Sequence, residues 1–138
     1  MNADLVEFIR ARLDDDEQVA RAASDGPWAA WVGPPLQRLG ALMHPVRTAG
    51  EGPSLQPTIE TALWMDSRHI AEWDPARVLA EVEAKRGVLD RYERALENRR
   101  AHPGDLASAG AVLALHGVVK TLTLPYAGHP DYQERWRL

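Results

Sequence analysis

The most ligand-like group of side chains in this 138-residue chain comprises His69, His129 and Asp131, which are of types that bind a transition metal. Imidazole nitrogens combined with a carboxylate oxygen suit zinc or another first-row metal. A helical metal site usually places two ligands four residues apart, but the residue four positions after His69 is Trp73. His69 therefore has no local partner ligand. We favour structural roles instead, with His69 at a helix start and His129 in a turn before Pro130.

Four consecutive acidic residues, at positions 14–17, could hold Mg²⁺ opposite Glu81 and Glu83. Such a site would make the protein a metal-dependent hydrolase of phosphate esters or nucleotides. Consecutive acids point around a helix in different directions, and only Asp14 and Glu17 share a face. The paired acidic motifs of helical nucleotide pyrophosphatases are absent from the sequence. We therefore expect a solvated acidic face, no cofactor and a role other than catalysis.

Nucleic-acid binding would depend on arginines near the end of a long helix and in the C-terminal tail. The helix contributes Arg91, Arg94, Arg99 and Arg100. Glutamates and aspartates alternate with these arginines and can pair with them along the helix. The whole chain has 16 Lys and Arg against 20 Asp and Glu, a net charge of −4. We expect nucleic acid to be at most a weak partner.

Five tryptophans in a chain of this size exceed what a small core requires, unless several line an interface. The aromatic residues that we consider for binding a protein partner are Trp28, Trp31, Trp73, Tyr126, Tyr132 and Trp136. The alternative is that these rings cover a thin helical core rich in alanine. Both interpretations follow from composition alone.

The elements that would position these residues are mostly helices. Apolar residues at helical spacing predict a first helix over residues 4–24, beginning with Asp4 as its cap. Asp66 starts a short helix that ends near Trp73. Asp74 and Pro75 then provide a cap and a first helical residue for a long helix that ends near residue 98.

Between residues 26 and 65 the chain changes character. Six of the ten prolines and five of the ten glycines lie between residues 26 and 57, which excludes a long helix there. Short apolar runs with aromatic or β-branched members predict two or three short strands, such as a small β-hairpin.

The most apolar stretch runs from residue 106 to residue 124 and predicts a buried core helix. Its small residues, Ala107, Gly110, Ala111, Ala114 and Gly117, would allow a neighbouring helix or a second copy to approach closely. A membrane-spanning interpretation is disfavoured because His116 and Lys120 lie within the stretch. The aromatic tail at 125–138 is expected to fold back over the helices.

Three segments together resemble a family of small actinobacterial and actinophage proteins known only as a domain of unknown function. The segments are DLVEFIRARLDDDEQVARAASDGPW from residue 4, HIAEWDPARVLAEVEAKR from residue 69 and LPYAGHPDYQERW from residue 124. In this family a second histidine is common where Trp73 stands, and an aspartate is frequent where Gly128 stands. The resemblance implies no activity, substrate or cofactor.

We therefore expect one mainly α-helical domain over residues 1–138. It would be a compact bundle of three main helices with additional short helices, an irregular insertion at about 26–65 and an aromatic tail. The N-terminus shows no export signal, since Asp4 and Glu7 stand where positive charge would be expected, and we expect a cytoplasmic protein. The expected role is binding, either to itself or to a protein partner, without a membrane.

Overall fold

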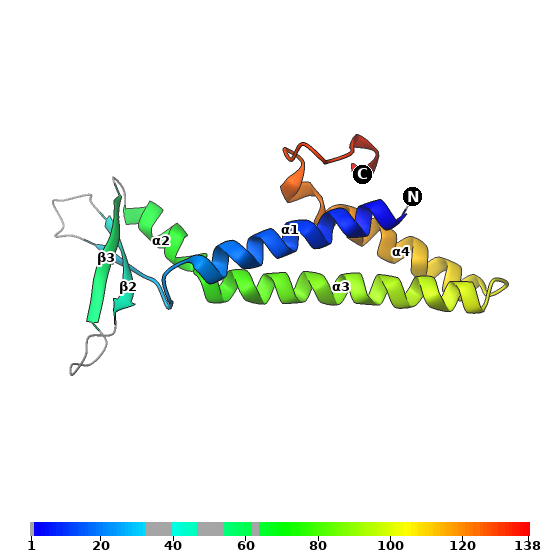
Figure 1. The fold of residues 1–138 in the computed structure, drawn as a ribbon, viewed down its shortest axis with the longest axis horizontal. Helices are drawn as coiled ribbons and strands as arrows, with labels where there is room; N and C mark the ends of the chain where they lie inside the picture. The colour runs from blue at the N-terminus through cyan, green and yellow to red at the C-terminus, as the bar shows by residue number, and fades with distance from the viewer. Residues whose placement is uncertain (1, 33–39, 47–53, 62–63) are drawn as a thin grey trace. The chain divides into compact units, whose positions relative to one another are not determined.

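The computed structural model describes residues 2–32, 40–46, 54–61 and 64–138, and the protein is mainly α-helical, as predicted (Figure 1). In chain order the elements are α1 (Asn2–Ala22), β1 (Ala29–Val32), β2 (Gly40–Val46), β3 (Ser54–Thr61), α2 (Trp64–Glu72), α3 (Pro75–Ala101), α4 (Leu106–Leu122) and the 3₁₀ helices η1 (Leu124–Tyr126) and η2 (Glu134–Trp136).

The chain divides into two compact units. Unit 1 comprises residues up to 16 and residues 81–138, and unit 2 comprises residues 17–80. Helices α1 and α3 each contribute residues to both units. The single domain over residues 1–138 stays a prediction.

Local sequence signals explain where two of the helices begin. The Asp74 carboxylate accepts a hydrogen bond from the Arg77 backbone N–H at 2.9 Å, and Pro75 is the first residue of α3, which confirms the predicted cap. Asp105 caps α4 in the same way by accepting from the backbone N–H groups of Ala107 and Ser108.

Helix α1 begins at Asn2, two residues before the predicted cap. Asp4 therefore lies in the first turn, where its negative charge is still favourable because the N-terminus of a helix carries partial positive charge.

Unit 1 has a continuous hydrophobic core. Helix α1 supplies its largest share, α3 supplies three residues, and α4 and the tail supply one each. The buried members are Leu5, Val6, Phe8, Ile9, Leu13, Val82, Leu89, Tyr92, Val119 and Trp136. Ion pairs flank this core, with Arg10 bound to Glu93 and Asp14 bound to Arg86, both at 2.6 Å. Their order along the two helices shows that α1 and α3 run antiparallel within the unit.

The tail folds back over α1, as predicted, and Phe8 is the residue on which it packs. The Phe8 ring lies 6.5 Å from the ring of Tyr126, 6.2 Å from that of Tyr132 and 4.8 Å from that of Trp136. Trp136 is 4% exposed. Burial of these aromatic rings fixes the C-terminal segment to the first helix.

Unit 2 contains an antiparallel sheet in the order β1-β2-β3, where the sequence predicts two or three short strands. The register between β2 and β3 shifts between Leu42 and Met43, where Met43 pairs with Pro57. Proline lacks a backbone donor and is tolerated there because β3 is an edge strand with an irregularity. Helix α2 contacts all three strands.

The prediction that α4 is a buried core helix is wrong. Within α4 only Ser108 and Val119 are buried. The helix packs against the hydrophobic core of unit 1 through one narrow face. Its small residues lie largely outside that face.

Candidate functional site

The most unusual surface of unit 1 is the outward face of α4, which exposes large apolar side chains. Leu106 is 87% exposed and Leu113 74%, while Val118, about 140° round the helix from Leu113, is 45% exposed. Leu124, in η1 directly after the helix, is 42% exposed. Single exposed apolar residues are ordinary on soluble proteins, but several on one helix indicate a surface that another apolar surface covers.

Small residues lie among these leucines. Gly110 and Gly117 have no atoms within 4 Å of the position that a Cβ would occupy, so both open outward. Ala114 is exposed between them. Thr121 is exposed as well, and its hydroxyl donates a hydrogen bond to the Gly117 carbonyl at 3.0 Å. The Thr121 hydroxyl therefore has a hydrogen-bond acceptor within the helix, and a partner can exclude water from this side of α4 without leaving that donor unpaired.

We call the set formed by Leu106, Gly110, Leu113, Ala114, Gly117 and Thr121 the outer face of α4. These residues repeat at spacings of three, four and seven, which places them along one side of the helix.

The opposite side of α4 holds the helix in place. Val119 is fully buried in the core of unit 1, and Val112, Leu115 and Leu122 pack against that core. His116 stacks on the buried Tyr92 of α3, with ring centroids 6.0 Å apart and an angle of 28° between the rings. The outer face is therefore presented by a helix whose orientation on the core is fixed.

The charge of α4 is unusually low. Lys120 is the only Asp, Glu, Lys or Arg side chain in its 17 residues, and the Lys120 ammonium donates to the Arg137 carbonyl at 2.9 Å. Helix α3 differs in composition, because acidic residues and arginines alternate along its length. The outer face of α4 lacks the charges that normally favour exposure to water.

The prediction of a buried core helix over residues 106–124 treats all of its apolar residues alike, whereas Leu113 is exposed and Val119 is buried. A signal was present in their spacing. Residues six apart on a helix are separated by roughly 120° around its axis, so these two side chains could not face one core.

The helical segment from Leu106 to Tyr126 is long and apolar enough to cross a membrane by length and composition. Within unit 1, however, α4 packs on a core whose other two helices carry exposed ion pairs, including Arg10 with Glu93 and Asp14 with Arg86. A bilayer around α4 would have to accommodate these charges, which is costly.

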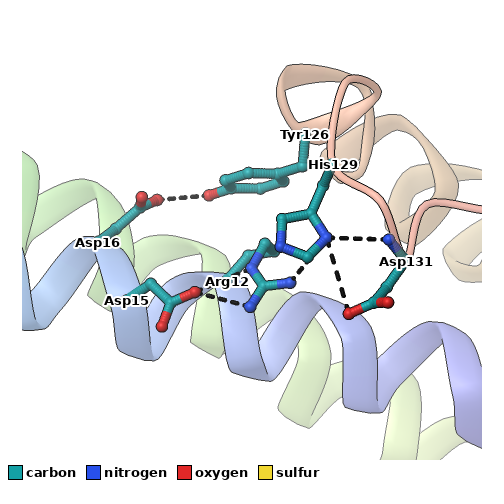
Figure 2. A network of polar contacts seen from close by, with 6 residues as sticks. All are labelled: Arg12, Asp15, Asp16, Tyr126, His129 and Asp131. Atoms are coloured by element: carbon teal, nitrogen blue, oxygen red, sulfur yellow. Dashed lines mark hydrogen bonds and ion pairs between the residues drawn. The ribbon is translucent and has the colours of Figure 1, made fainter.

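A second feature of unit 1 is a polar network between α1 and the tail, in which Arg12 lies between Asp15 and His129 (Figure 2). The Arg12 guanidinium donates to Asp15 Oδ2 through Nε at 3.0 Å and Nη2 at 2.7 Å. Its Nη1 lies 3.2 Å from His129 Nδ1, to which the Asp131 backbone N–H also donates at 3.1 Å. Two donors converge on this nitrogen, so we assign it as an acceptor.

The same network contains Tyr126, whose hydroxyl donates to Asp16 Oδ2 at 2.5 Å (Figure 2). Burial, and then the bond to the Asp16 carboxylate, raise the pKa of Tyr126 far above its ordinary value of 10.0. The hydroxyl therefore stays protonated at neutral pH. It fastens the start of the tail to α1.

Two of the predicted metal ligands, His129 and Asp131, lie together in unit 1, with Nδ1 and Oδ2 3.8 Å apart. His69 lies in α2 of unit 2. Among the described residues no group of three or more histidine, aspartate and glutamate side chains could hold a metal ion. The Arg12 guanidinium beside His129 Nδ1 also repels a cation. The geometry therefore lends no support to the metal hypothesis.

The acidic run at 14–17 does not converge on one point. Asp14 binds Arg86, Asp15 binds Arg12, Asp16 accepts from Tyr126, and Glu17 binds Arg21. Each carboxylate has its own partner in a different direction, as expected from their helical positions. A shared Mg²⁺ site would require these contacts to be broken.

The four arginines considered for nucleic acid have different surroundings. Arg99 donates to the carbonyls of His102, Pro103 and Asp105 and thereby stabilises the turn between α3 and α4.

Arg91, Arg94 and Arg100 are exposed. Asp90 and Glu97 lie one turn before and one turn after Arg94, so this surface of α3 carries both signs of charge.

The six aromatic residues considered for partner binding are also divided. Trp136 is buried in unit 1, and Tyr126 and Tyr132 pack against that core. In unit 2 the indole N–H of Trp28 donates to the Ser24 carbonyl at 3.0 Å. Trp73 is 43% exposed, and the Arg77 guanidinium lies over its ring at 4.2 Å. The side chain of Trp31 lies outside the described residues.

A groove of about 580 Å³ lies between α1 and α3 in unit 1. Val6 and Leu96 are among its apolar lining residues, while Arg10, Glu93 and Arg100 bring charges of both signs. The pair of Arg10 with Glu93 satisfies two of these charges internally. Charges of both signs line the groove, so it does not favour a ligand of one charge.

Comparisons with known proteins define the family of this chain. No curated protein and no solved structure matches it. The model of a family of unknown function, DUF6221, matches residues 2–138. This match covers every helix and strand described above. The chain therefore belongs to this family of unknown function.

Proposed function

We propose that this protein is a cytoplasmic interaction protein that binds a protein partner through the outer face of α4. The observation that carries the proposal is the exposure of Leu106 and Leu113, at 87% and 74%, on a helix with a single charged side chain. Covering these side chains removes apolar area from water at about 25 cal/mol per Å².

The chemistry of this face favours an apolar helix as its ligand. Gly110, Ala114 and Gly117 leave room for a backbone to approach, and Leu106 and Leu113 project beside that space. Ridges and grooves of this kind are how helices pack on one another. A polar or charged ligand would find no complementary group on this face.

An enzymatic role has less support. Each acid of the 14–17 run is engaged by its own partner, and the Arg12 cation lies beside His129. We therefore place binding ahead of metal-dependent hydrolysis and of nucleic-acid recognition.

A cysteine-labelling experiment tests the proposal without knowledge of the partner. The natural chain has no cysteine, so Leu113→Cys introduces a single reactive thiol on the outer face. Val19→Cys is a matched control, because Val19 is 71% exposed on α1. Both variants are labelled in native cells with a membrane-permeant maleimide, and the labelling is normalised to the denatured protein.

We expect the thiol at position 113 to be protected in cells about tenfold relative to that at position 19, because a bound partner excludes the reagent. Equal labelling of the two positions in cells would contradict the proposed function.

A further inference from the structure

We infer that the partner of the outer face is a second copy of this chain, bound with the two α4 helices antiparallel. This inference rests on the proposed function, since it names the occupant of the same surface. Three features of the face carry it, namely its shape, its dry character and the distribution of charge at its ends.

The shape of the face complements itself in one register. Consider a twofold axis that passes between Leu113 and Ala114 and reverses the second helix. Each large residue then meets a smaller one, with Leu113 opposite Ala114 and Leu106 opposite Thr121. Gly110 meets Gly117 at both ends of the contact, where neither glycine has an atom within 4 Å of its Cβ position.

A parallel pair lacks this match, because every residue then meets its own copy. The leucines at 106 and 113 would face one another across the contact, and the glycines would leave gaps between them. The antiparallel register fills the glycine gaps with closely approaching backbone and gives an isologous contact that closes at two copies.

The charges at the ends of α4 also favour the antiparallel arrangement. Asp105, exposed at the N-terminal cap, and Lys120, near the C-terminus, are fifteen residues apart. Reversal of the partner brings the Lys120 end of one helix beside the Asp105 end of the other, and it also opposes the two helix dipoles.

Disulfide crosslinking tests this geometry directly, because only introduced cysteines can react. Three single variants are prepared, Leu106→Cys, Ala114→Cys and Thr121→Cys, with Val19→Cys as a control on another helix. Each is oxidised alone, and Leu106→Cys is also oxidised as a mixture with Thr121→Cys. Circular dichroism before oxidation verifies that each variant is folded.

The antiparallel register predicts that Ala114→Cys crosslinks with itself, because position 114 lies next to the axis. Leu106→Cys is expected to crosslink with Thr121→Cys at least tenfold faster than with itself, and the control at position 19 is expected to remain uncrosslinked. Efficient crosslinking of Leu106→Cys with itself would mean a parallel pair and would overturn the inference.

The inference and the proposed function can fail separately. If no α4 pair crosslinks while the thiol at position 113 is still protected in cells, the occupant is not a second copy, but the outer face remains a binding surface. Protection of that thiol in purified protein only on addition of phosphatidylglycerol vesicles would assign the face to a lipid surface and would overturn both.

Discussion

Leu113 and Val119 lie six residues apart on α4, yet Leu113 is 74% exposed and Val119 is fully buried. One helix therefore has two apolar sides, of which only one is covered within unit 1. The contrast separates residues that stabilise the fold from residues that are available for binding.

Replacement of each of these residues by alanine should have opposite consequences. Val119→Ala removes buried methyl groups and is expected to lower the free energy of unfolding by about 2 kcal/mol. Leu113→Ala is expected to change it by no more than about 0.5 kcal/mol in the dissociated protein. Urea denaturation at low protein concentration measures both values. A large loss for Leu113→Ala would mean that α4 is covered within the molecule.

Gly110 and Gly87 provide a second matched pair, because both lie inside helices with open space at the Cβ position. Alanine at either position should raise the free energy of unfolding of the dissociated chain by up to about 1 kcal/mol, since glycine is the poorer helix former.

Only Gly110→Ala should also weaken self-association, because its methyl group fills the space that the partner helix needs. Analytical ultracentrifugation of the two variants measures this difference. Equal association of Gly110→Ala and Gly87→Ala would argue against close packing at Gly110.

The tail is expected to be part of the stable fold. Trp136 is 4% exposed and lies 4.8 Å from the Phe8 ring. Trp136→Ala should lower the free energy of unfolding by about 3–5 kcal/mol, because it leaves a large cavity beside Phe8. Leu138→Ala is the control, since Leu138 is 73% exposed. Thermal unfolding should show a large decrease in Tm for the first variant and almost none for the second.

Tyr126 should make stability depend on alkaline pH. Its pKa is raised in the folded protein, so below about pH 10 the hydroxyl keeps its proton in both states and its contribution is fully present. As the pH rises above that value, the unfolded chain loses the proton first, and stability falls. Denaturation between about pH 9 and pH 11 should therefore show a shallower decline for Tyr126→Phe than for the natural protein.

Tyr132→Phe is the control for removal of a tyrosine hydroxyl. The Tyr132 hydroxyl is buried and has no hydrogen-bond partner among the described residues. At neutral pH its removal should be neutral or stabilising, whereas Tyr126→Phe should cost about 1 kcal/mol through loss of the bond to Asp16. Equal costs for the two variants would contradict the role assigned to the Tyr126 hydroxyl.

Much of the helical architecture could be predicted from local signals. Two helix starts are indicated by capping residues, namely Asp74 followed by Pro75, and Asp105 before the apolar stretch. In the structure both aspartates accept hydrogen bonds from backbone N–H groups of the first helical turn. The tail could be predicted to fold back because rings such as Trp136 are costly to leave in water. These features can be predicted because they depend only on residues close in sequence or on the burial of large aromatic rings.

The outward orientation of α4 could not be predicted in the same way. A high apolar content predicts that a helix is buried, but it does not show whether the surface that buries it belongs to the same molecule or to a partner. The contact between Arg12 and His129 joins residues 117 positions apart, so no local pattern indicates it. The spacing of Leu113 and Val119 does predict that they lie on different sides of α4, because residues six apart are separated by roughly 120° around a helix axis.

Sedimentation velocity of the tag-free chain over a range of concentrations, together with Leu113→Lys and Val19→Lys, measures self-association through the outer face of α4. We expect a dimer for the natural chain and for Val19→Lys. For Leu113→Lys we expect dissociation with a Kd raised about 30-fold, because two lysines would lie next to the twofold axis. If the natural chain and Leu113→Lys both sediment as monomers at all concentrations, the outer face of α4 does not join two copies.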